Sequence, residues 1–228
     1  FPYTTLFRSY KLLGGSIGFY GSTLNTRQYA TKGYLEKLIA QVFTGRERFE
    51  PGNPREGYSP SPQERQSWLQ ISYMKEAYHT MGPKFTLGWM AEALYSSKNF
   101  SENYTATMMQ AGEFAPTPHS KLMYNEAFRA NQYVAAGIKP IYVLNDMFQF
   151  RTEFYGFTPI FPIKKNALNK AYYGKAFSRF EYMGEVSVIC HLPFGAISAY
   201  VNHYSSPRRE WNVGMTIGWQ LFNYRFVE

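Results

Sequence analysis

The feature that most constrains this chain is an alternation of apolar and polar residues with a period of two. The clearest case is the segment from Trp211 to Phe222, in which every second residue is apolar. Successive side chains of a β-strand point to opposite faces of a sheet, so the pattern predicts a strand with one apolar and one polar face. The apolar set is Trp211, Val213, Met215, Ile217, Trp219 and Leu221.

The same pattern recurs along the chain and predicts nine strands. Most of them approach the ~9–11 residues that a membrane-crossing β-strand needs. No stretch approaches the ~18 consecutive apolar residues of a membrane-spanning helix, which argues against a helical membrane protein. We therefore expect an all-β, antiparallel fold. The other eight expected strands are 85–95, 148–154, 180–192 and 196–204, with weaker patterns at 11–22, 34–44, 67–78 and 133–144.

The polar face of these strands favours a membrane barrel over a soluble β-sandwich, which would also alternate. In 148–154, aromatic residues alternate with Gln149, Arg151 and Glu153. A face of this kind suits a water-filled lumen. The expected cluster of lumen charges is Arg151, Glu153, Arg179, Glu181 and Glu185.

Glu181 and Glu185 have the even spacing that places two carboxylates on one strand face. Such a pair could act as an acid and a base. We expect them instead to pair with lumen arginines such as Arg151 and Arg179.

The links between the expected strands alternate in length. Outer-membrane barrels have short periplasmic turns and longer external loops. With the short links in the periplasm, the C-terminus is periplasmic as well. The long links are 45–66, 97–131 and 160–176, the short ones are 79–84, 145–146 and 193–195, and 205–210 is intermediate.

Composition narrows the class of partner. The 228 residues are 19% aromatic and 18% charged, with a net charge of +8. The cations are scattered along the chain, which favours anionic membrane lipids and lipopolysaccharide over nucleic acid. Cys190 is the single cysteine, so an internal disulfide is excluded. No nucleotide or metal motif is present, and we expect no cofactor.

The first nine residues, FPYTTLFRS, resemble the translation of a sequencing adaptor. We exclude them from the fold prediction. The expected domain organisation is therefore an adaptor-like segment, 1–9, and a partial β-barrel domain, 10–228. We expect the natural protein to begin upstream.

One motif suggests an enzyme. Gly14 to Gly18 matches the G-x-S-x-G pattern of a nucleophile elbow, with Ser16 as the nucleophile. The elbow needs a strand, a tight turn and a helix, and the residues after Gly18 do not have a helical pattern. A soluble enzyme using Ser16 is therefore the least favoured alternative, and no catalytic residue is assigned in this chain.

Three segments resemble known barrels. The sequence LNTRQYATKG at 24–33 resembles a periplasmic turn of the surface-antigen barrel superfamily, which includes outer-membrane assembly factors. The segments 128–137 and 150–156 are similar to the C-terminal barrel of patatin-like phospholipases from Bacteroidetes-type bacteria, and GWQLFN at 218–223 fits that group. The resemblance covers residues 10–228.

The resemblance implies a position within a larger barrel. In the superfamily a long external loop carries an Arg that folds into the lumen, and five strands follow it. Arg129 ends the longest link here and is followed by five expected strands, although Ala130 stands where the family has Gly. By this resemblance the chain holds about nine C-terminal strands of an incomplete, up-and-down, sixteen-stranded transmembrane barrel.

The resemblance also implies a function. It implies the outer-membrane anchor or translocation module of a patatin-like phospholipase, whose lipid acyl hydrolase domain lies upstream in the same polypeptide. The expected location is the outer membrane of a Gram-negative type of cell, with membrane lipids, lipopolysaccharide and the barrel assembly machinery as partners. The alternative is a surface-antigen barrel that acts in assembly or transport without an enzyme domain.

Overall fold

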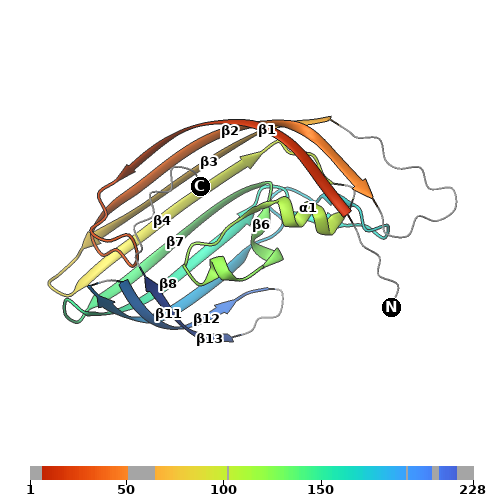
Figure 1. The fold of residues 1–228 in the computed structure, drawn as a ribbon. Coiled ribbons are helices and arrows are strands. Elements are labelled where there is room, and N and C mark those ends of the chain that lie inside the picture. Colours follow the sequence, from red (N-terminus) through yellow and green to blue (C-terminus); the bar gives the residue numbers. More distant parts are fainter. Residues whose placement is uncertain (1–6, 51–64, 102, 194, 207–210, 220–228) are drawn as a thin grey trace, which may run out of the picture.

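Nine strands form a single antiparallel sheet in which each strand lies beside its nearest sheet neighbours in the sequence (Figure 1). The computed structural model describes residues 7–50, 65–101, 103–193, 195–206 and 211–219. All nine predicted strands are confirmed. They are β1 (Phe7–Ser22), β2 (Gly33–Glu50), β3 (Arg65–Thr80), β4 (Phe85–Ser96), β7 (Gln132–Val143), β8 (Phe148–Pro159), β11 (Glu181–Leu192), β12 (Gly195–Tyr204) and β13 (Trp211–Trp219).

The bounds of the strands differ from the predicted ones mainly at the ends. β2 and β8 extend beyond the predicted segments, where Gly, Pro and charged residues weaken the alternation. β1 starts at Phe7, so the last three residues of the adaptor-like segment pair with 48–50. Residues 220–222 of the predicted last strand lie outside the described residues.

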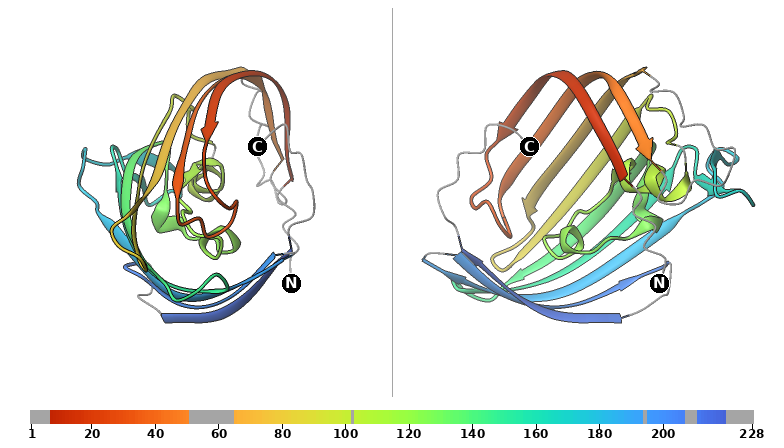
Figure 2. Two further views of the ribbon diagram at one scale, coloured as in Figure 1. Left: turned by 90° about the vertical axis from the view of Figure 1, so that its left-hand side faces the viewer. Right: turned by 45° about the vertical axis from the view of Figure 1, so that its right-hand side comes forward.

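The sheet is strongly curved. Two further views show it bending from β1 round to β13, with the link between β4 and β7 inside the bend (Figure 2). In the described sheet, β1 and β13 are the edge strands, each with one neighbour. The curvature gives the sheet a convex outer face and a concave inner face.

The links between neighbouring strands of the sheet lie alternately at its two ends, because every pair of neighbours is antiparallel. One end has the links 23–32, 81–84, 144–147 and 193–194. The other end has 51–64, 97–131, 160–180 and 205–210. The two longest links, 97–131 and 160–180, share one end, as the sequence predicts.

The link 97–131, here called the inner segment, has structure of its own. The sequence predicts it only as a loop. It contains a short helix, α1 (Tyr104–Gln110), which begins where the side chain of Asn103 accepts a hydrogen bond from the Ala106 N–H at 2.8 Å. The rest contains β5 (Gly112–Glu113), the 3-10 turns η1 (Ser120–Leu122) and η2 (Glu126–Phe128), and β6 (Arg129–Ala130).

The second long link also forms a small hairpin. Its strands are β9 (Ile163–Lys165) and β10 (Ala171–Tyr173), which pair antiparallel. These strands are too short for an alternating pattern to reveal them.

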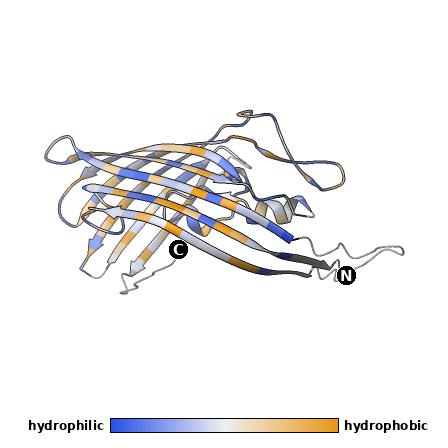
Figure 3. Ribbon diagram, turned by 90° about the horizontal axis from the view of Figure 1, so that it is seen from above, coloured by the Kyte–Doolittle hydropathy of each residue, from blue (hydrophilic) through white to orange (hydrophobic). Residues whose placement is uncertain are grey.

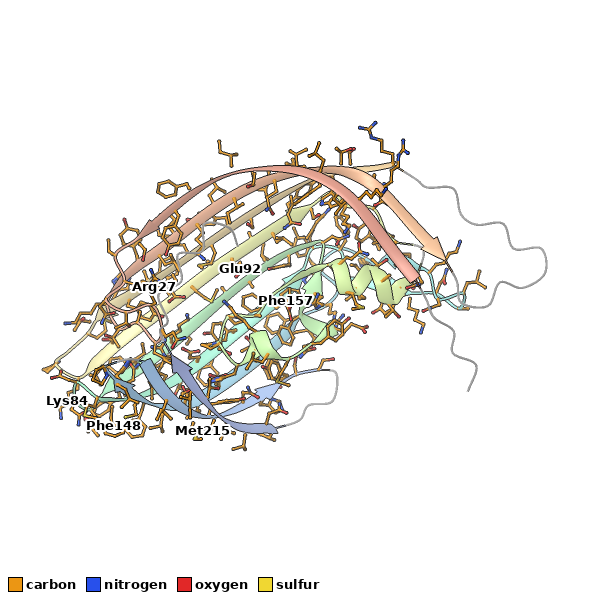
Figure 4. The ribbon with its side chains drawn as sticks, in the orientation of Figure 1. Arg27, Lys84, Glu92, Phe148, Phe157 and Met215 are labelled. Carbon is orange, nitrogen blue, oxygen red and sulfur yellow. The ribbon has the colours of Figure 1, made fainter. Side chains whose placement is uncertain are left out.

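The apolar core lies between the inner segment and the concave face of the sheet. Phe157 of β8 is fully buried and its ring lies 5.9 Å from that of Phe114 and 5.6 Å from that of Phe128, both in the inner segment. Tyr133 of β7 lies 5.0 Å from the same ring. Figure 4 shows Phe157 and Glu92 on the concave side. The inner segment is therefore held by aromatic packing.

Within the described residues no helix is long and apolar enough to span a membrane.

The core predicts a difference between two phenylalanines of one strand. Phe157→Ala should cost about 3–5 kcal/mol of unfolding free energy, because it leaves a cavity between the sheet and the inner segment. Urea unfolding and hydrogen exchange of residues 111–131 would measure the loss. Phe154→Ala is the control, since Phe154 is 53% exposed on the other face. Equal effects of the two substitutions would contradict this packing.

Candidate functional site

The two faces of the sheet have the reverse polarity of a soluble sheet. On β8 the exposed residues are Phe148, Phe150 and Phe154, whereas Arg151 and Glu153 are buried. A soluble antiparallel sheet buries its apolar face and exposes its polar one. The alternation of hydropathy along the strands is visible in Figure 3, and Figure 4 shows Phe148 and Met215.

The apolar outer face is continuous across the sheet. Pairing places outward residues of neighbouring strands side by side, and one such row crosses five strands. Monomeric soluble proteins rarely expose apolar patches larger than a few hundred Å². This row consists of Tyr142, Phe150, Val188, Ala199 and Met215.

Aromatic residues mark both ends of the outer face. On β4, Phe85 and Tyr95 are exposed and stand ten positions apart, with only Leu, Trp and Ala facing outward between them. At ~3.3 Å per residue and a strand tilt of ~40°, this spacing corresponds to roughly 25 Å, the height of the apolar band of a membrane barrel. Other exposed aromatic residues near the strand ends are Tyr34, Tyr142, Phe148, Phe180, Tyr182 and Trp211.

The outer face contains one described ion pair. Lys75 lies 3.4 Å from Glu36, which also accepts a hydrogen bond from the Tyr73 hydroxyl at 2.7 Å. Glu36 is the fourth residue of β2, near the end of the sheet with the shorter links. The pair is therefore placed toward one margin of the apolar face.

The concave face holds buried ion pairs at its centre. Arg151 and Glu153 are 2.8 Å apart and both are buried, and Lys139 lies 2.8 Å from Glu76 on the neighbouring side. Removing either partner of a buried pair is costly, because the other charge is left uncompensated. The pairing of Arg151 with Glu153 therefore allows the concave face to hold charge without water.

The turn 23–32 folds into the concave side and contacts the same arginine. The Arg151 guanidinium donates to the Ala30 carbonyl at 2.9 Å, and Gln149 donates to the Tyr29 carbonyl at 3.0 Å. The strand β8 thereby fixes the turn between β1 and β2, far away in the sequence. Burial raises the pKa of the Tyr29 phenol, so the hydroxyl stays protonated.

The five predicted lumen charges all lie on the concave side of the sheet or at its rim, but as separate pairs. Arg179 binds Glu181 at 2.7 Å, near the end with the longer links. Glu185 does not pair with an arginine as predicted: its partner is His119 of the inner segment, at 2.8 Å. The arginines are used by nearer carboxylates, and the inner segment brings its own partner to Glu185.

The site that the sequence did not reveal is a buried network around His119. Its Nδ1 lies 2.8 Å from Glu185, its Nε2 lies 3.2 Å from the Ser198 hydroxyl, and the Tyr29 hydroxyl donates to Ser198 at 2.8 Å. The ring of Tyr200 stacks on the imidazole at 3.5 Å. The network joins the inner segment, the turn 23–32 and two strands. No sequence motif could reveal it, since its members come from four distant segments.

The order Ser198, His119, Glu185 is that of a serine hydrolase triad, but its surroundings do not suit hydrolysis. A nucleophile must be reachable and must stand beside free N–H donors for the oxyanion. Ser198 is 1% exposed, is covered by Tyr29, and lies within β12 between two hydrogen-bonded strands. The network therefore fixes the inner segment to the wall.

Arg129, the expected lumen-loop arginine, organises the inner segment itself. Its guanidinium forms an ion pair with Glu113 and donates to the carbonyls of Met109 and Ala111, both at 3.2 Å. It also lies over the ring of Tyr124 at 4.8 Å. Arg129 thus satisfies the carbonyl groups left free where α1 ends.

Ser16 does not stand on a nucleophile elbow. Gly14 to Gly18 lie within β1, and Ser16 pairs with Gln41 of β2. Extended strand on both sides replaces the required turn and helix, so the enzyme hypothesis based on this motif is wrong. In the described part of the chain, no group of three His, Cys, Asp or Glu residues could hold a metal ion.

Comparison with known proteins adds no relative. No protein-family model, no curated protein and no solved structure matches the chain. The structure itself defines the class: an all-β protein with one nine-stranded antiparallel sheet, polar on the buried face and apolar on the exposed face.

The buried ion pair predicts a large effect of one carboxylate. Glu153→Gln should lower the unfolding free energy by about 3–5 kcal/mol, because Arg151 stays buried without its counter-charge. Glu36→Gln is the matched control and should change little, since its partner Lys75 is partly exposed to solvent. Urea unfolding of both variants checks this, and equal losses would refute the assignment.

Proposed function

We propose that this chain is a wall segment of an outer-membrane β-barrel, acting as the anchor or translocation module of a patatin-like phospholipase. The observation that carries the membrane part is the reversed polarity of the sheet. Its exposed face is apolar across the sheet and its buried face holds the paired charges. In lipid, the apolar face would be solvated by acyl chains and the strand pairing would satisfy the backbone.

The orientation follows from the same proposal. The end with the longer links, which includes the inner segment and the β9–β10 hairpin, faces outward from the cell, and the short links face the periplasm. The spacing of Phe85 and Tyr95 along β4 supports a strand long enough to cross the membrane. Lipids, lipopolysaccharide and the barrel assembly machinery are the proposed partners.

The patatin part rests on the sequence resemblance at 128–137 and 150–156. The proposed hydrolase domain lies upstream in the same polypeptide. The alternative is a surface-antigen type of barrel acting in assembly or transport without that domain. The way in which Arg129 and His119 hold the inner segment on the concave side is compatible with either function.

Labels on neighbouring residues of β13 test the membrane proposal. With Cys190→Ser as background, a fluorescent label at Val213→Cys should be strongly quenched by brominated lipid in reconstituted vesicles, because Val213 is 79% exposed on the outer face. A label at Asn212→Cys, on the other face, is the control. Equal quenching at both positions, or none at Val213, would overturn the proposal.

The gene upstream of residue 10 separates the two functions. For the phospholipase module we expect it to encode a domain with a serine elbow and an Asp-Gly pair, and the purified whole protein to release fatty acids from phospholipid. Periplasmic repeat domains in its place, with no acyl hydrolase activity, would support the assembly or transport barrel.

A further inference from the structure

A shallow groove crosses the outer face where β7, β8 and β11 lie side by side. Its volume is about 390 Å³, within the ~300–1,000 Å³ typical of small-molecule sites. The residues that line it on the outer face are Ala136, Ile138, Phe154, Gly156, Phe180 and Tyr182.

The groove exists because small residues meet in the strand pairing. Ala136 of β7 pairs with Gly156 of β8, which pairs with Tyr182 of β11. A Cβ at position 156 would lie 3.0 Å from the ring of Phe180, so that ring packs directly over the glycine. Larger apolar side chains flank this floor, giving an apolar channel along the strands.

A strongly cationic link lies at one end of this groove. The link 160–180 contains Lys164, Lys165, Lys170, Lys175 and Arg179, and no Asp or Glu. The four lysine residues are exposed, and among the described residues none of them forms an ion pair. Arg179 is bound to Glu181, so the uncompensated charge lies on the lysines.

Backbone hydrogen bonds fix this link above the groove. The Phe177 N–H donates to the Ile160 carbonyl at 2.9 Å, and the Gly174 N–H donates to that of Pro162 at 2.7 Å. Both bonds hold residues 174–177 against the chain leaving β8, three residues before Phe180 enters the groove wall. Charge and groove are therefore parts of one continuous surface.

We propose that this surface is a binding site for a phosphorylated, acylated glycolipid of the lipid A type. Acyl chains lie in the groove between β7, β8 and β11, and the phosphate groups are bound by the lysines of 160–180. Lysine ammonium groups attract phosphate as point charges, and their attraction is strongest beside an apolar surface that orders the lipid. The proposal rests on the proposed membrane location, and it adds a selective lipid to it.

Lipid selectivity is the test. The purified chain in detergent micelles is titrated with diphosphoryl lipid A, with its dephosphorylated form, and with inorganic phosphate, and bound lipid is counted by native mass spectrometry. We expect diphosphoryl lipid A to bind at least roughly tenfold more tightly than the dephosphorylated form. Inorganic phosphate at the same concentration should not compete.

Two matched pairs of variants locate the site. Ala136→Leu fills the floor of the groove and should reduce binding, whereas Ala199→Leu, an exposed outward alanine of β12, should not. Lys164→Gln, Lys165→Gln and Lys175→Gln together should remove the preference for phosphate. The triple variant Arg27→Gln, Lys32→Gln and Lys84→Gln, at the opposite end of the sheet, should retain it.

The outcomes separate this inference from the membrane proposal. Quenching at Val213 without any preference for phosphorylated lipid, or with equal loss in site and control variants, would overturn the lipid site alone. Competition by inorganic phosphate would reassign the lysines to a soluble anion and would also overturn it. Absence of quenching at Val213 would overturn the membrane location first.

Discussion

The structure depends on the compensation of charge on the concave face. Arg151, Glu153 and Lys139 are all buried, and each has an oppositely charged group within 2.8 Å. Buried charges are tolerated only when they are paired and hydrogen-bonded. The curvature of the sheet and the two segments folded into it supply those partners, so the arrangement inside the bend is as specific as an apolar core.

Two segments from opposite ends of the sheet meet in this interior. The inner segment contributes His119, the turn 23–32 contributes Tyr29, and both contact Ser198 of β12. The contacts join elements that are distant in sequence, and the network has the cooperative character expected of buried hydrogen bonds. The aromatic cluster around Phe157 adds apolar packing to the same segment.

The outer face follows another rule. Its side chains are large, apolar and exposed, and they are interrupted by small residues only where the groove between β7, β8 and β11 lies. The exposed lysines of 160–180 stand next to that groove. Apolar surface and charge are thus separated along the strand direction, as in side chains that meet both a membrane interior and its headgroups.

The sequence by itself determined the strands, their antiparallel order and the alternation of long and short links. These properties are local: a period of two sets which face a residue occupies, and short links force neighbouring strands to pair antiparallel. The same pattern assigned Arg151, Glu153, Glu181 and Glu185 to the polar face. It could not assign their partners, because partner choice depends on distance in space.

Only the tertiary structure decided what lies inside the bend. A helix as short as α1 has too few turns for a periodic pattern, and its N-cap Asn103 is a common residue in loops. His119 had no visible role because Glu185 and Ser198 are separated from it by more than sixty residues. Local pattern fixes the face of a strand, whereas the long-range contacts that fold the inner segment back fix the partners of its buried charges.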